Sequence, residues 1–139
     1  MISNKLKSGD EVRVIAPSRS MKIINAETHE IATKRLTDLG LKVTFGKNVD
    51  LCDDFTSSPI EARIEDLNEA FADKNVKDIL TVIGGFNSNQ LLTHIDYELI
   101  KNNPKIFCGF SDITALNDAI YAKTGLVTYS GPHYSSFGM

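Results

Sequence analysis

The segment "KIFCGFSDITAL", residues 105–116, places a serine where an apolar strand meets the start of a helix. A serine on such a turn exposes its hydroxyl, and the backbone N–H of the next residue, Asp112, can face an oxyanion. The match to the G-x-S-x-G motif is incomplete, because Ile113 stands in place of the second glycine. Two interpretations therefore remain open: Ser111 is a nucleophile, or Ser111 or Asp112 is an N-cap of the helix. The local pattern slightly favours the cap.

A second segment, "VIGGFNSNQLL", could contribute to the same chemistry. Gly84 and Gly85 directly follow an apolar run, so the backbone there can approach a ligand closely or take a positive φ. The N–H of Gly85 could be the second oxyanion donor that amide or ester hydrolysis needs. The alternative is an ordinary turn followed by an Asn or Ser cap. The spacing fits neither G-x-G-x-x-G nor a P-loop, so we expect no dinucleotide.

A nucleophilic serine needs a base, and the chain has three histidines. His29 and His94 lie within predicted helices and are expected to be surface or packing residues. His133 follows the last predicted strand, at the same sheet edge as Ser111, so it is the one local candidate. No acidic residue beside it is an evident orienting partner. No Cys/His cluster has the spacing of metal ligands, and we expect no metal.

Short apolar runs alternate with amphipathic stretches along the whole chain. The runs predict strands at 11–17, 41–46, 76–85, 105–110 and 126–132. The stretches predict helices at 25–40, 58–73, 88–103 and 112–125. The second helix would begin with Ser58 as N-cap, and the third would be broken near Asp96. This alternation predicts a doubly wound α/β fold with a mainly parallel five-stranded sheet, flanking helices and a nucleophile-elbow-like turn after the fourth strand.

In an open parallel sheet, ligands bind beyond the carboxyl ends of the strands. That rule selects five loops, which contain many of the small polar residues of the chain. They are residues 17–19, the loop at Gly46, and residues 84–89, 109–112 and 130–133.

Length and charge exclude several classes of function. A chain of 139 residues fits one domain, and its net charge of −3 is spread without a basic patch, so we expect no nucleic-acid partner. There is no signal peptide and no apolar stretch of about 20 residues, which predicts a cytoplasmic protein without membrane contact. Cys52 and Cys108 are expected to be free thiols.

The end of the chain leaves Tyr134 and Phe137 without an evident partner, which suggests one domain of a longer protein.

Several segments in order resemble the LD-carboxypeptidase family of serine peptidases. They are "VIAPS", "EARIEDLNEAFAD", "VIGGFNSNQLL", "NNPKIFCGFSDITAL" and "KTGLVTYSGP". The Asn-Ser-Asn after the double glycine is most similar to the branch that includes the microcin C self-immunity peptidase. The resemblance covers nearly the whole chain.

The resemblance implies that Ser111 is the nucleophile and that the N–H groups of Gly85 and Asp112 form the oxyanion hole. We also expect substrate contacts from Gly84, Asn87, Ser88 and Ser18. In the family, the triad glutamate and histidine lie in a C-terminal domain that no stretch of this chain matches. Residues 1–139 would then be the N-terminal, nucleophile-bearing domain, nearly inactive alone, and His133 would not be the base.

The implied reaction is amide cleavage through an acyl-enzyme on Ser111, in a murein peptide or a peptidyl- or aminoacyl-nucleotide. It requires no metal or organic cofactor, and the resemblance implies a homodimer at full length. One alternative is a non-catalytic α/β module that binds a small ligand, with Ser111 as a cap and hydrogen-bond donor. Another is an amidotransferase-like domain with serine in place of cysteine.

Overall fold

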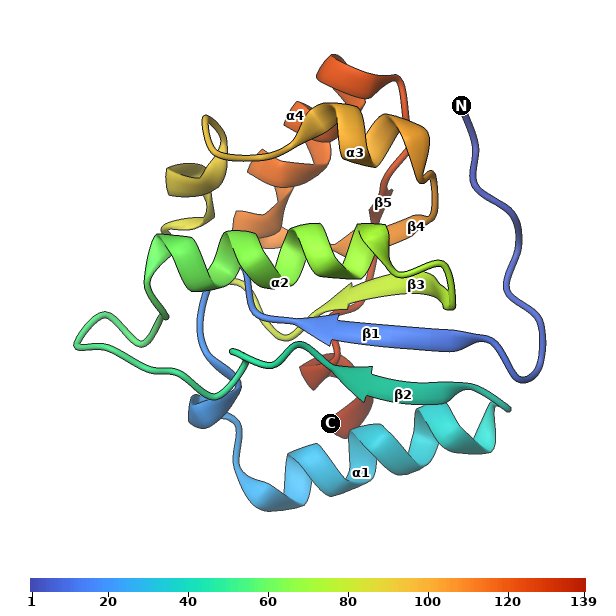
Figure 1. Cartoon of the computed structure of the whole chain (residues 1–139). Coiled ribbons are helices and arrows are strands. Elements are labelled where there is room, and N and C mark those ends of the chain that lie inside the picture. Colours follow the sequence, from blue (N-terminus) through green and yellow to red (C-terminus); the bar gives the residue numbers. More distant parts are fainter.

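The computed structural model describes all residues, 1–139, as a five-stranded sheet flanked by helices (Figure 1). All strands are parallel, in the order β2-β1-β3-β4-β5, which confirms the predicted fold. The strands are β1 (Glu11–Ile15), β2 (Lys42–Phe45), β3 (Val76–Thr81), β4 (Ile106–Gly109) and β5 (Tyr129–Ser130). The chain changes direction across the sheet between β1 and β3, where such folds form a crevice at the carboxyl ends of the strands.

The α-helices are α1 (Ala26–Asp38), α2 (Ile60–Ala72), α3 (Tyr97–Asn102) and α4 (Thr114–Thr124). Short 3-10 turns are η1 (Met21–Ile23), η2 (Ser88–Leu91), η3 (Ser111–Ile113) and η4 (Ser135–Gly138). One core cluster joins α2, α3 and α4 to one face of the sheet, and a second joins α1 to the other (Figure 1). Both faces are covered, which explains why β3 and β4 contribute apolar side chains to both clusters. None of the helices combines the length and apolarity needed to cross a membrane.

Three elements differ from the sequence-based prediction. Ser58 is not the N-cap of α2: the helix begins after Pro59 without a side-chain cap, and the Ser58 carbonyl accepts a hydrogen bond from Arg63 instead. The predicted third helix consists of η2 and α3, and the break near Asp96 is confirmed because Asp96 caps α3. The fifth strand is limited to Tyr129–Ser130.

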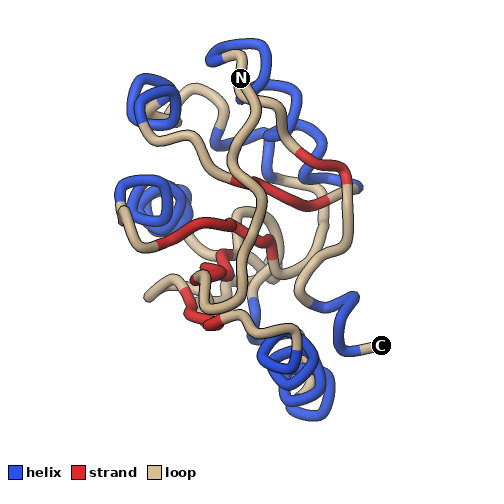
Figure 2. Tube along the Cα trace, turned by 90° about the vertical axis from the view of Figure 1, so that its right-hand side faces the viewer, coloured by secondary structure: helices blue, strands red, loops and turns tan.

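The C-terminal segment packs on α1, so the expectation that Tyr134 and Phe137 lack partners was wrong. Tyr134 is completely buried, and its hydroxyl donates to the His29 carbonyl at 2.9 Å and contacts Thr33 Oγ1 at 2.6 Å. Figure 2 shows the C-terminal turn beside the sheet, on the other side from α2. The partner could not be found locally, because α1 lies a hundred residues earlier in the chain.

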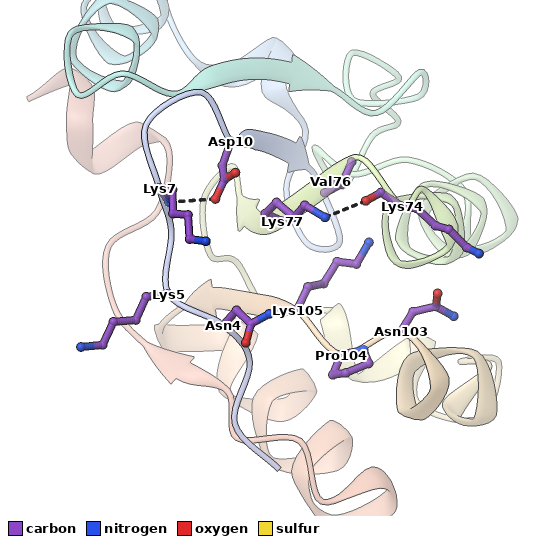
Figure 3. A pocket seen from close by; sticks show the side chains of 10 residues that line it. All are labelled: Asn4, Lys5, Lys7, Asp10, Lys74, Val76, Lys77, Asn103, Pro104 and Lys105. Atoms are coloured by element: carbon purple, nitrogen blue, oxygen red, sulfur yellow. Dashed lines mark hydrogen bonds between the residues drawn. The ribbon is translucent and has the colours of Figure 1, made fainter.

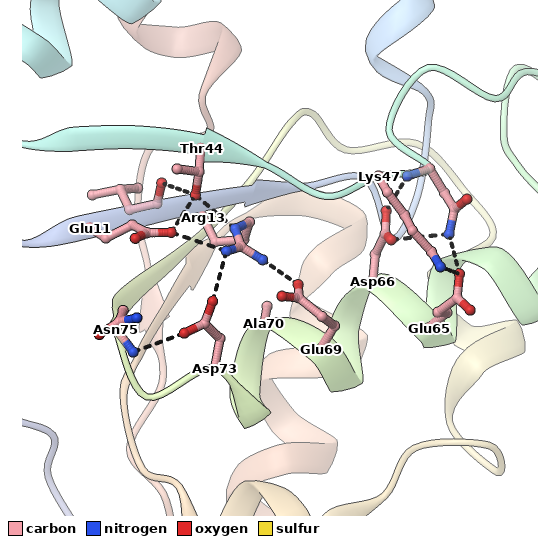
Figure 4. A network of polar contacts seen from close by, with 12 residues as sticks. Glu11, Arg13, Thr44, Lys47, Glu65, Asp66, Glu69, Ala70, Asp73 and Asn75 are labelled. Carbon is pink, nitrogen blue, oxygen red and sulfur yellow. Dashed lines mark hydrogen bonds and ion pairs between the residues drawn. The ribbon is translucent and has the colours of Figure 1, made fainter.

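A polar network ties α2 to the sheet (Figure 4). Arg13 points from β1 towards α2 and binds Glu11 and Asp73 at 3.0 and 3.1 Å, and it also contacts Glu69. Thr44 on β2 accepts from Arg13 Nε at 2.7 Å. A partly buried arginine is stable here because carboxylates and a hydroxyl satisfy its donors.

Asp78 on β3 has no comparable partner. Its side chain is nearly buried, and one carboxylate oxygen makes no hydrogen bond. Burial raises its pKa from 3.8 to about 7, because the charged form loses its hydration. Burial, and secondarily the charge of Asp78, also raises the pKa of the Cys108 thiol to about 11.

We expect Asp78→Asn to stabilise the protein at pH 8 and to change little at pH 4. The unfolded carboxyl loses its proton near 3.8 and the folded one near 7, so the wild type loses stability as the pH rises between these values. The shift corresponds to about 4 kcal/mol at most. Urea unfolding at both pH values measures it, with exposed Asp118→Asn as the control. An equal effect of Asp78→Asn at both pH values would contradict the buried-charge explanation.

Candidate active site

The loops that follow β1, β3 and β4 meet at the carboxyl edge of the sheet, and Ser111 lies among them. Ser111 is exposed and begins η3, two residues after β4 ends. Its φ is 58°, and only Thr56 shares a positive φ among the non-glycine residues. The left-handed conformation costs a non-glycine residue about 1–2 kcal/mol, so the surrounding contacts must hold it there.

Neither Ser111 nor Asp112 caps a helix, so the cap interpretation was wrong. Phe110 precedes η3 and Ile113 precedes α4, both without a side-chain cap hydrogen bond. The carboxylate of Asp112 points instead to the neighbouring loops. Its Oδ2 accepts from Ser18 Oγ at 2.6 Å and from the Ser88 N–H at 2.9 Å.

Ser88 completes this contact, because its hydroxyl donates to the Asp112 carbonyl at 2.8 Å. Ser18 follows β1 and Ser88 follows β3, so Asp112 joins both loops to the turn that carries Ser111. Hydrogen bonds to a carboxylate are about twice as strong as neutral ones.

Gly84 and Gly85 lie beside this turn. A Cβ at Gly84 would lie 3.3 Å from Ser111 Cβ, 3.4 Å from Ser111 Oγ and 3.6 Å from His133 Nε2. A Cβ at Gly85 would collide with Ser18 Oγ and would lie 2.7 Å from Arg19 Cγ. Glycine is therefore required at Gly85 for the close approach of the loop after β1, and a side chain at Gly84 would press on Ser111. The N–H of Gly85 makes no hydrogen bond within the protein and is free to bind a ligand oxygen.

Arg63 on α2 binds backbone carbonyls of the loops after β1 and β3. It is buried, and its guanidinium donates to the carbonyls of Ser58 at 2.9 Å and of Pro17 and Asn87 at 3.2 Å. It also donates to Gln90 Oε1 at 2.7 Å. Burial lowers the pKa of Arg63 from its usual value. The rigid fork of donors links the loop after β1 to the loop after β3.

His133 is the histidine that approaches Ser111. It is buried; its Nδ1 pairs with Thr81 Oγ1 at 2.8 Å, and its ring stacks on Phe110 with the centroids 4.3 Å apart. Burial lowers its pKa below the usual value, although the Phe110 backbone acts in the other direction. Its Nε2 is buried without a hydrogen-bond partner. No carboxylate orients this ring as a triad would require.

Residues 12–131 match the sequence profile of the LD-carboxypeptidase N-terminal domain. The chain belongs to the LD-carboxypeptidase family. YocD of Bacillus subtilis is 56% identical over the whole chain, which spans 43% of that protein. The chain thus spans about two fifths of the relatives it matches.

Solved structures agree with this LD-carboxypeptidase assignment. The MccF-like protein of Bacillus anthracis matches the whole chain with a TM-score of 0.99 and 62% identity, and the chain covers 42% of it. The microcin C7 self-immunity protein MccF, in complex with aspartyl sulfamoyl adenosine, matches the whole chain with a TM-score of 0.94 and 35% identity, again over 42% of that chain.

In this LD-carboxypeptidase domain, four of the residues predicted for the site come together: Ser111, Asp112, Gly84 and Gly85. The other three are buried behind them. Ser18 and Ser88 are bonded to Asp112, and Asn87 Nδ2 donates to Ser57 Oγ at 2.8 Å. Two aromatic side chains beside the turn are exposed instead, Phe86 by 63% and Phe110 by 44%.

Proposed function

We propose that Ser111 is the nucleophile of a serine carboxypeptidase that cleaves an amide bond. The observation that carries this proposal is an exposed serine with a left-handed backbone at the start of η3, next to Gly84, whose neighbour Gly85 has a free N–H. Family membership supports the hydrolase class, since the family is one of carboxypeptidases. Asp112 supports it as well, because its carboxylate fixes the turn to the two neighbouring loops.

In the proposed reaction, Ser111 Oγ attacks the carbonyl carbon of the amide and gives its proton to a base. The negative charge moves to the carbonyl oxygen, which the N–H groups of Gly85 and Asp112 stabilise. The C–N bond then breaks, and the amine leaves with the proton. Water attacks the resulting ester and releases the acid and the free serine. Ser18, Ser88 and Asn87 keep the loops in place, while Gly84 leaves room for the substrate.

The base and its acidic partner are proposed to lie in a C-terminal domain. Three observations support this: the chain spans only about two fifths of its relatives, His133 lacks an orienting carboxylate, and the loops after β3 and β4 each expose an aromatic side chain, Phe86 and Phe110, that a second domain would cover. The assembled protein is proposed to be a homodimer, as the family resemblance implies.

Two substrate classes fit this proposal. The complex of MccF with aspartyl sulfamoyl adenosine favours an aminoacyl- or peptidyl-nucleotide. A relative from Bacillus subtilis that is named as a murein peptide carboxypeptidase, 40% identical over 94% of the chain, favours a murein peptide. The Asn-Ser-Asn after the double glycine, Asn87 to Asn89, makes the nucleotide class the first to test.

The nucleophile is tested with a serine-directed phosphonate on the full-length protein. We expect the reagent to add a single phosphonyl group to Ser111, located by peptide mass spectrometry. Ser111→Ala should abolish this labelling, and Ser130→Ala, at the same sheet edge, should leave it unchanged. A folded protein in which Ser111 stays unlabelled would favour the non-catalytic binding module.

A further inference from the structure

A polar pocket of about 450 Å³ lies at the amino ends of β1, β3 and β4, on the opposite edge of the sheet from Ser111. Figure 2 looks onto this edge, and the N-terminal segment runs across it. We call it the lysine pocket, because five of its ten lining residues are Lys5, Lys7, Lys74, Lys77 and Lys105. Its volume is in the range of small-molecule sites.

The ammonium groups of the lysine pocket form no ion pairs within the protein, although the charges of Asp73 and Glu69 act on Lys105. Asp10 is the one acidic residue of the lining, and its carboxylate accepts from the Lys7 backbone N–H at 2.8 Å. The ion pairs of the structure are made by other cations: Arg13, Lys34, Lys42 and Lys47. Five lysines therefore line this edge of a chain whose net charge is −3.

The ammonium groups differ in how firmly they are held. Lys105 is nearly buried, and its Nζ donates to the carbonyls of Ala70 at 3.0 Å and Asp73 at 2.7 Å, which leaves one donor over. Lys77 Nζ donates to the Lys74 carbonyl at 3.0 Å. In Figure 3, Lys7, Lys77 and Lys105 surround the hollow, whereas Lys5 and Lys74 extend away from it.

We propose that the lysine pocket binds a small polyanion that carries at least two phosphate groups. Val76 is its one apolar lining residue, so the ligand must be recognised by charge and hydrogen bonds. Lysine ammonium groups bind phosphate as point charges, and three around one hollow match the separated charges of a diphosphate. Burial already lowers the pKa of Lys105 to about 8, so a bound anion would also recover part of the lost charge stabilisation.

The test is calorimetric titration of the full-length protein with inorganic diphosphate at pH 7 in 50 mM salt. We expect the double variant Lys7→Gln/Lys77→Gln to bind at least tenfold more weakly. The matched variant Lys34→Gln/Lys123→Gln removes the same charge on α1 and α4 and should change Kd less than twofold. Chemical-shift titration of the Lys105 side chain should show a higher pKa when diphosphate is bound.

Three outcomes would overturn the proposal. Equal weakening in both double variants would show attraction by net charge alone. Unchanged binding in Lys7→Gln/Lys77→Gln would place the anion elsewhere, for example near Ser111. Absence of binding at millimolar diphosphate would leave the lysines as a solvated surface. Labelling of Ser111 by the phosphonate is a separate readout, so this result does not depend on the proposed catalysis.

Discussion

Alone, this 139-residue chain is expected to hydrolyse amide substrates at least about 10³-fold more slowly than the full-length protein. The reason lies around Ser111. His133 is buried, pairs with Thr81 rather than with a carboxylate, and stacks on Phe110. His29, on α1, is hydrogen-bonded to Tyr134, and His94 lies before α3. Without a positioned base, only the proposed oxyanion donors and substrate binding would remain to accelerate the proposed reaction.

The measurement compares initial rates of the chain and of the full-length protein on a murein tetrapeptide and on an aminoacyl-sulfamoyl adenosine. Circular dichroism confirms that the shorter chain is folded. His133→Gln in the full-length protein is the control and should lower kcat by less than about tenfold, because this ring borders the site without serving as the base. Equal rates for the two proteins, with a large loss in His133→Gln, would identify His133 as the base.

Replacing Asp112 is expected to have the second largest effect. Asp112→Ala should lower kcat/KM of the full-length protein by about 10²-fold, because small displacements of reacting groups have effects of this size. The carboxylate holds Ser18 at 2.6 Å and the Ser88 N–H at 2.9 Å, both on one oxygen. Its loss would release the loop that carries Gly85 from the turn that carries Ser111. We therefore predict that Asp112 acts as a positioning residue through its side chain.

Asp112→Asn provides the conservative test. An amide oxygen can still accept both hydrogen bonds, so this variant should remain within about tenfold of the wild type. Asp118→Ala, an exposed carboxylate further along α4, should change kcat/KM less than twofold. The rate of phosphonate labelling of Ser111 should fall in parallel in Asp112→Ala. If only thermal stability fell, with labelling and kcat/KM unchanged, Asp112 would have a purely structural role.

Most of the fold could be predicted from local patterns. Parallel strands buried on both faces are apolar throughout, and helices carry one apolar stripe, so the alternation along the chain indicated a doubly wound sheet. Errors occurred where a residue's partner is distant in sequence. The sequence shows no partner for Tyr134, because its partners in the structure, His29 and Thr33, lie on α1. The local pattern at Ser58 predicts an N-cap, but the helix begins after Pro59 and the Ser58 carbonyl binds Arg63 instead.

The sequence does contain a pattern that could have indicated the buried position of Arg63. It lies on the same stripe of α2 as Ile60, Ile64 and Leu67, which is an apolar stripe. A charged residue on a buried stripe needs polar partners, and these are the carbonyls of the neighbouring loops. The pattern of α2 could thus have indicated that it supports the site.

By itself, the sequence determined the order of elements, the turn at Ser111 and the glycines after β3, because these depend on neighbours within a few residues. Only the tertiary structure decided what Asp112 does with its carboxylate, where His133 points and which lysines share a pocket. The strand order brings the loops after β1, β3 and β4 to one edge, and the segments that precede them to the other. Residues that are far apart in the chain come into contact at these edges, and local periodicity does not predict which residues form these contacts.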